Sequence, residues 1–133
     1  MLAPAVDGIR LTLHVLAAAV WVGGQLTVAG LLRTVRQMGP DAPRSVARAF
    51  ARLSWPAYAV LLATGVWNMS AAGNHQSSPW KLVLSVKIAV ALLAGLAAFL
   101  HTRSGSRAGL AVWGAISASA SLGALVMGVF LAG

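Results

Sequence analysis

The stretch LTLHVLAAAVWVGGQLTVAGLL, residues 11–32, decides the fold because it carries no formal charge and is rich in Ala, Leu, Val and Gly. Crossing the hydrocarbon core of a bilayer takes about 20 apolar residues in helical form. A helix satisfies its backbone hydrogen bonds internally, as hydrocarbon requires. Together with Arg10, the stretch predicts a membrane helix over residues 10–32.

Three more apolar runs follow, and we expect them to span the membrane over 53–72, 81–101 and 109–132. Apolar residues make up 59% of the chain and charged residues 9%, against about 25% charged in soluble domains. No run shows the alternating polarity of a membrane strand. Short connections favour antiparallel neighbours. The sequence therefore predicts one all-α domain over 1–133, an integral membrane four-helix up-down bundle.

The charges predict the orientation of this bundle. The net charge is +8, and the loop 71–80 carries none of it. Two loops, between the first and second spans and between the third and fourth, hold seven arginines: Arg33, Arg36, Arg44, Arg48, Arg52, Arg103 and Arg107. Positive loops stay in the cytoplasm. We therefore expect both termini outside, a lipid bilayer as the partner of the arginines, and no nucleic acid.

The inner loops and the last span predict local structure. The segment 38–43, MGPDAP, reads as a turn because Gly and Pro break helices. After it, Arg44, Arg48 and Arg52 share one helix face and predict an amphipathic lead-in to the second span. In the fourth span, small residues recur at three- and four-residue steps and predict close helix packing: Ser117, Ser121, Ala124 and Gly128.

Two ionisable residues lie inside predicted spans, His14 and Lys87. Such residues are costly in hydrocarbon and need a reason to be there. The helical repeat places His14, Trp21 and Gln25 on one stripe, which we expect to face the bundle. Counted from the outer ends of their spans, His14 and Lys87 have similar depth. Each residue also has a purely structural explanation. His14 can form a helix-helix hydrogen bond, and Lys87 can snorkel outward to the membrane surface.

A copper site is one functional reading of these residues. His75, in the uncharged outer loop, can reach the outer end of the bundle above His14. Met69, near the outer end of the second span, offers a soft thioether. His14, His75 and Met69 are therefore the candidate copper ligands. His101 lies 14 residues beyond Lys87 in the same span, about 21 Å deeper, and is expected at the opposite interface.

The first three spans resemble the copper resistance protein D (CopD) family. The likeness covers residues 10–103, through LHVLAAAVWVGG, FARLSWPAYAVLLATGVWN and LVLSVKIAVALLAGLAAFLHTR. Its residues fall in order: His14, Trp21, Gly23, Gly24, Thr64, Gly65 and Lys87. The resemblance implies copper uptake or handling in a bacterial plasma membrane. The chain is similar to the four-helix core of that family, without the Met- and His-rich segments expected of a transporter.

A weaker likeness is to HemJ-type protoporphyrinogen oxidases, small four-helix proteins with a first-helix histidine and a third-helix lysine. This resemblance implies haem b, with His14 and Lys87 at the cofactor. The chain lacks the polar, Arg-rich flanks of that family.

Three functions remain open from the sequence. The first is binding or conduction of copper through an outer-leaflet histidine site. The second is a haem b protein, either a porphyrinogen oxidase or an electron-transfer subunit. The third is a non-catalytic accessory subunit that packs against other membrane-protein subunits or a second copy of the chain. Asp7 and Asp41 are the only acids, so paired-carboxylate hydrolysis is not expected, and a non-enzyme is favoured.

Overall fold

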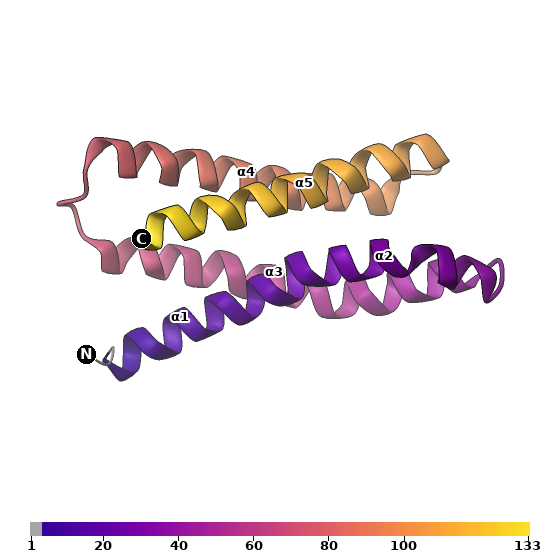
Figure 1. The fold of residues 1–133 in the computed structure, drawn as a ribbon, viewed down its shortest axis with the longest axis horizontal. Helices are drawn as coiled ribbons and strands as arrows, with labels where there is room; N and C mark the ends of the chain where they lie inside the picture. Colours follow the sequence, from indigo (N-terminus) through magenta and orange to yellow (C-terminus); the bar gives the residue numbers. More distant parts are fainter. Residues whose placement is uncertain (1–3) are drawn as a thin grey trace. The chain divides into compact units, whose positions relative to one another are not determined.

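The computed structural model describes residues 4–133, which form helices joined by short loops, with no strand among them. The helices fall into two compact units, Met1–Gly73 and Asn74–Gly133. Each unit is an antiparallel helical hairpin (Figure 1). The predicted all-α class is confirmed for the described part of the chain, which contains four helices.

The first arm of the first hairpin is one long helix in three segments. These are α1 (Ala5–Ala18), the π-helical turn η1 (Ala19–Gly23) and α2 (Gly24–Gln37). The helix continues through the π turn because the residues at both junctions keep αR conformation (Figure 1). The predicted 10–32 lies inside this helix, which extends further at both ends.

A short turn reverses the chain after α2. Gly39 has a φ of 142°. A residue with a side chain would be strained in this backbone conformation, so glycine suits the position. Helix α3 (Ala42–Ala72) then begins with Pro43 in its first turn, a position where the missing N–H of proline costs nothing. The predicted break is confirmed over residues 38–41, whereas Ala42 and Pro43, also predicted in the turn, already belong to α3.

Helix α3 runs without interruption for 31 residues and contains Pro56 in its interior. The Arg-rich lead-in and the predicted span 53–72 are therefore one helix. Three helices are long and apolar enough to cross a membrane: Ala5–Gln37, Ser78–Arg103 and Arg107–Ala132. Helix α3 is not among them, because even its apolar part contains aromatic and polar side chains such as Trp55, Tyr58 and Asn68. That 53–72 crosses the bilayer stays a prediction.

The second hairpin consists of α4 (Ser78–Arg103) and α5 (Arg107–Ala132). A serine caps the start of each helix, Ser77 for α4 and Ser106 for α5. Each hydroxyl oxygen accepts the N–H three residues later, at 3.4 and 3.0 Å. Such caps satisfy donors that the first helical turn leaves open. Helix α4 contains the predicted third span, and α5 contains the predicted fourth span.

Small side chains form the seam between α4 and α5. Ala94 and Ala97 are 1% and 0% exposed, and Ser117 and Ser121 are 2% and 3% exposed. The Ser117 hydroxyl donates to the Ala94 carbonyl oxygen at 2.9 Å. Small residues let helix backbones approach closely. The predicted packing role of the serines in the fourth span is therefore confirmed.

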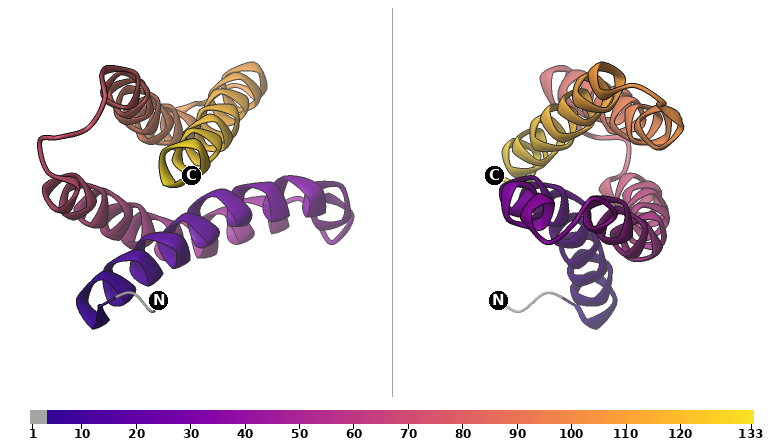
Figure 2. Two further views of the ribbon diagram at one scale, coloured as in Figure 1. Left: turned by 60° about the vertical axis from the view of Figure 1, so that its left-hand side comes forward. Right: turned by 90° about the vertical axis from the view of Figure 1, so that its right-hand side faces the viewer.

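Aromatic packing holds the π turn against α3. Trp21 is 3% exposed, and its ring centroid lies 5.5 Å from that of Trp55 and 4.5 Å from that of Tyr58. Next to it, Gly24 meets the ring of Phe50 so closely that a Cβ on the glycine would overlap the ring. Helices α1 and α3 lie side by side in all views (Figure 2).

Candidate functional site

His14 lies on α1 and is half-buried against α3. Its Nδ1 lies 2.8 Å from Oγ1 of Thr64, which is itself 4% exposed. The hydrogen bond joins residues fifty positions apart and fixes the imidazole against the facing helix. The packing alternative considered for His14, a helix-helix hydrogen bond, is therefore observed.

The hydroxyl proton of Thr64 decides which nitrogen of His14 carries hydrogen. Thr64 donates to the Val60 carbonyl oxygen at 2.7 Å, with Leu61 O at 3.2 Å as a second acceptor. A hydroxyl has one proton to donate, so with that proton on the Val60 carbonyl oxygen, Oγ1 accepts from Nδ1–H of His14. The lone pair of the neutral ring is then on Nε2. Metal-binding histidines are oriented in this way, by a hydrogen bond from the other ring nitrogen.

Gly65 lies beside the same ring on α3. A Cβ built on Gly65 would lie 3.8 Å from Cε1 of His14, an ordinary van der Waals contact, so an alanine would also fit there. The sequence singled out Thr64 and Gly65 only through the family resemblance, and the structure places both residues next to His14.

The other residues of the predicted stripe lie on the same long helix. Trp21 is buried among the α3 aromatics, and Gln25 is half-buried one turn beyond it. The π turn lies between His14 and Gln25 and carries the extra residue of a wider helical turn. Regular helical spacing does not anticipate such a turn.

The three predicted copper ligands are spread over both units. His14 and Met69 belong to the first hairpin, where the Met69 side chain is 37% exposed on α3. His75 is exposed in the loop that begins the second unit. Among residues 4–133, no three His, Asp or Glu side chains gather into a group that could hold a metal ion. The structure therefore gives no support of its own to a ready-made copper site.

Lys87 lies on α4 and folds against α5. A Cβ built on Gly128 would lie only 2.7 Å from Nζ of Lys87. The glycine thus leaves the space in which the ammonium group sits, and the side chain is half-buried. Lys87 belongs to the second unit and His14 to the first, so their common role stays a prediction.

His101 closes the other end of the second hairpin. Its Nδ1 lies 2.8 Å from the Leu110 carbonyl oxygen, which can only accept, so Nδ1–H donates. The ring packs on Gly114, where a Cβ would be 3.1 Å from Nδ1. Next to it, Arg103 lies 4.9 Å from the ring centroid of Phe99. His101 therefore ties the end of α4 to the start of α5.

One polar pair escaped the sequence analysis. Arg10 forms an ion pair with Asp7, with Nη2 3.0 Å from Oδ1, and its side chain is 11% exposed. Its Nε and Nη1, and Oδ1 of Asn68, are buried without a hydrogen-bond partner in the described chain. The sequence offered one signal, since Arg10 precedes His14 by one helical turn and shares its face.

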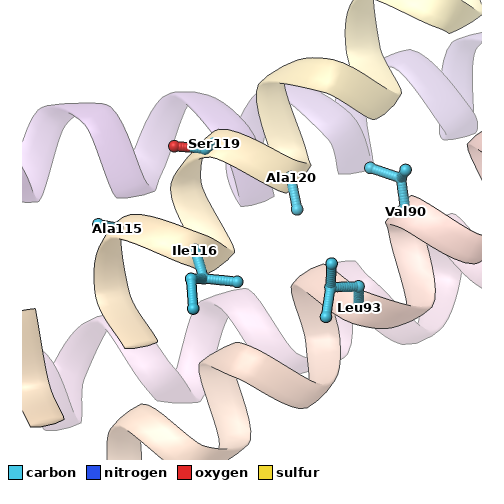
Figure 3. Close-up of a pocket in the computed structure, with 6 residues that line it drawn as sticks. All are labelled: Val90, Leu93, Ala115, Ile116, Ser119 and Ala120. Atoms are coloured by element: carbon cyan, nitrogen blue, oxygen red, sulfur yellow. The ribbon is translucent and has the colours of Figure 1, made fainter. Parts of the chain in front are cut away.

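A shallow apolar groove marks the surface of the second hairpin (Figure 3). Its lining comes from α4 and α5: Val90, Leu93, Ala115, Ile116, Ser119 and Ala120. Ser119 supplies the only side-chain hydroxyl in this lining. The groove has no group that could ligate a metal or move a proton, so the candidate chemistry lies elsewhere.

Comparison of the chain with protein-family models, curated proteins and solved structures gave no match. The fold itself defines an all-helical protein in which three helices could cross a membrane. The structure places an oriented histidine in the first hairpin and two basic side chains seated on glycines in the second.

Proposed function

We propose that the chain is a multi-pass protein of a bacterial plasma membrane, with four helices across the bilayer and both termini outside. The three long apolar helices support the membrane environment. The seven arginines lie around the two helix connections 38–41 and 104–106, whereas the connection 73–77 has no formal charge. This asymmetry supports cytoplasmic placement of the two basic connections.

Within this membrane protein, His14 is a ligand to a transition metal, and copper is the metal we propose. The hydrogen bond to Thr64 carries the proposal, because it orients the imidazole through Nδ1, as the partners of metal-binding histidines do. The resemblance to the CopD family supports copper. Copper(I) accepts imidazole and thioether donors, and His75 and Met69 are the proposed further ligands.

Haem b is the second candidate, and one observation favours it. No group of three His, Asp or Glu side chains that could hold a metal ion by themselves occurs among residues 4–133. A haem iron needs only axial ligands from the protein because the macrocycle supplies the others. His14 would then be the axial ligand, with Lys87 near the macrocycle, as the weaker family likeness implies.

One set of measurements separates the candidates. The purified protein is examined by visible absorption and by elemental analysis after copper loading. Bound copper without a haem absorption band supports the first proposal, and a haem absorption band supports the second. The absence of both would overturn metal binding and leave the accessory-subunit reading.

His14→Ala and His101→Ala form a matched pair for the same measurements. Both remove an imidazole whose Nδ1 bonds a facing helix. We expect His14→Ala to abolish metal or haem binding and His101→Ala to retain it. Equal binding by both variants and the parent would show that His14 only packs.

A further inference from the structure

The end of the first hairpin where α1 begins and α3 ends contains a buried guanidinium with unused donors. The Arg10 side chain is 11% exposed, and its only described partner is Asp7, through Nη2. Nε and Nη1 are fully buried and have no acceptor in the described chain. Leaving donors of a charged group unsatisfied is costly, so this position calls for an acceptor.

The helix register brings an unused acceptor to the same level. His14 faces Thr64 across the antiparallel pair. Arg10 lies four residues before His14 and Asn68 four residues after Thr64, so each is one turn further toward this end. Oδ1 of Asn68 is also buried without a partner. The layer therefore offers two kinds of N–H donor from Arg10 and one acceptor from Asn68.

The chain holds no second acid that could serve this layer. Its only other acid, Asp41, precedes the first turn of α3. Arg10 faces the last turns of α3, and the helix is 31 residues long, about 46 Å at its helical rise. Apart from Asp7, an anionic acceptor for Nε and Nη1 therefore comes from outside the described residues.

We propose that Arg10 and Asn68 form a binding site for a phosphate monoester group. Guanidinium binds phosphate oxygens through charge-assisted hydrogen bonds. A singly protonated monoester also has a P–OH that can donate to Oδ1 of Asn68. A phosphodiester lacks that proton, so it satisfies Arg10 but not Asn68. The group can come from phosphatidic acid or from inorganic phosphate, which share this chemistry.

The test measures binding by the purified, full-length protein of phosphatidic acid, phosphatidylglycerol and inorganic phosphate. Native mass spectrometry in detergent counts the bound lipids, and competition with inorganic phosphate separates the two sources. We expect phosphatidic acid to bind more tightly than phosphatidylglycerol. Displacement by inorganic phosphate identifies the phosphate group itself as the ligand; retention identifies the lipid as the required source. Equal binding of both lipids, or no binding of either lipid or phosphate, would overturn the proposal and leave water as the partner of Arg10.

Asn68→Asp is the decisive variant because it should not harm the fold. Its new carboxylate can pair with Arg10 and takes the place of the phosphate. We expect binding to fall about tenfold or more, the size expected for loss of a charge-assisted hydrogen bond, while thermal stability is kept. Arg33→Gln removes an exposed charge in the same hairpin and should bind like the parent. Unchanged binding by Asn68→Asp would refute the site.

The phosphate site does not depend on the metal proposal. His14→Ala should leave phosphate binding unchanged, and Asn68→Asp should leave metal binding unchanged. Loss of one activity without the other therefore shows which of the two proposals fails.

Discussion

The hydroxyl group of Thr64 sets both the position and the tautomer of the His14 ring. Its proton goes to a carbonyl oxygen of its own helix, and its oxygen receives the Nδ1 proton of His14. The side chain thereby selects a ring tautomer as well as a position. This makes Thr64 a positioning residue for whatever His14 binds.

Replacing Thr64 by Val keeps the shape of the side chain and removes the hydroxyl. We expect metal or haem affinity to fall about 10- to 100-fold, the usual effect of losing a partner that orients a ligand. Thr27→Val is the matched control, because Thr27 makes the same bond to its own helix, to Gly23 O at 2.7 Å, on an exposed face. Equal losses in the two variants would contradict the orienting role of Thr64.

The sequence could identify some of these residues but not their partners. His14 is conspicuous because an ionisable residue in an apolar run is costly. Asn68 is not, since a polar residue near a helix end is ordinary. Its relation to Arg10 depends on the register between α1 and α3, and that register follows from packing across fifty residues of chain. Sequence spacing within one helix carries no information about it.

At the scale of elements, α4 and α5 pair large residues with small ones. Lys87 packs on Gly128, and His101 packs on Gly114. These two contacts are two heptads apart on each helix. Midway between them on α4, the Ala94 carbonyl oxygen accepts the hydrogen bond from α5. A seven-residue repeat of contacts is typical of helices that cross at a small angle.

The Ser117 hydrogen bond should contribute measurably to this hairpin. We expect Ser117→Ala to lower the free energy of unfolding by about 0.6 kcal/mol, the average for such bonds in membrane proteins. Ser119→Ala removes a hydroxyl from the groove lining on the same helix and serves as control. Reversible unfolding in mixed micelles measures both. Equal stability of the two variants would show that the bond to Ala94 contributes nothing.

Gly24 should be essential for the first hairpin. A methyl group at this position overlaps the Phe50 ring, so Gly24→Ala should destabilise the protein by about 1–3 kcal/mol through overpacking. Gly30→Ala, where nothing lies within 4 Å of a Cβ, should have no such cost. Adding Phe50→Leu to Gly24→Ala should restore part of the stability. Thermal unfolding followed by circular dichroism compares the variants; no rescue would mean that another contact is limiting.

The helices themselves follow closely from the sequence, because long apolar runs and Gly-Pro turns are strong local signals. The π turn at Ala19–Gly23 does not. It widens the helix within an unbroken apolar run, and the packing of Trp21 on Trp55 and Tyr58 stabilises it from the facing helix. Local periodicity alone cannot predict a turn that tertiary contacts impose.

For the whole molecule, orientation is the property that most needs a test. The chain has no cysteine, so single-cysteine variants report unambiguously. Gly133→Cys should react with an impermeant thiol reagent applied from outside the cell, and Gly105→Cys, in the connection between α4 and α5, should react only after permeabilisation. The expectation follows from the arginines that flank Gly105. The reverse pattern would invert the topology.

The uncharged connection at 73–77 separates two sets of contacts that each close within a hairpin. The His14–Thr64 bond and the aromatic packing hold the first, and the bonds of Ser117, His101 and Trp80 hold the second. A chain cut between Gly73 and Asn74 loses none of these bonds. During synthesis, the first hairpin can therefore complete its contacts before the second leaves the ribosome, and two separately made hairpins would each keep these bonds.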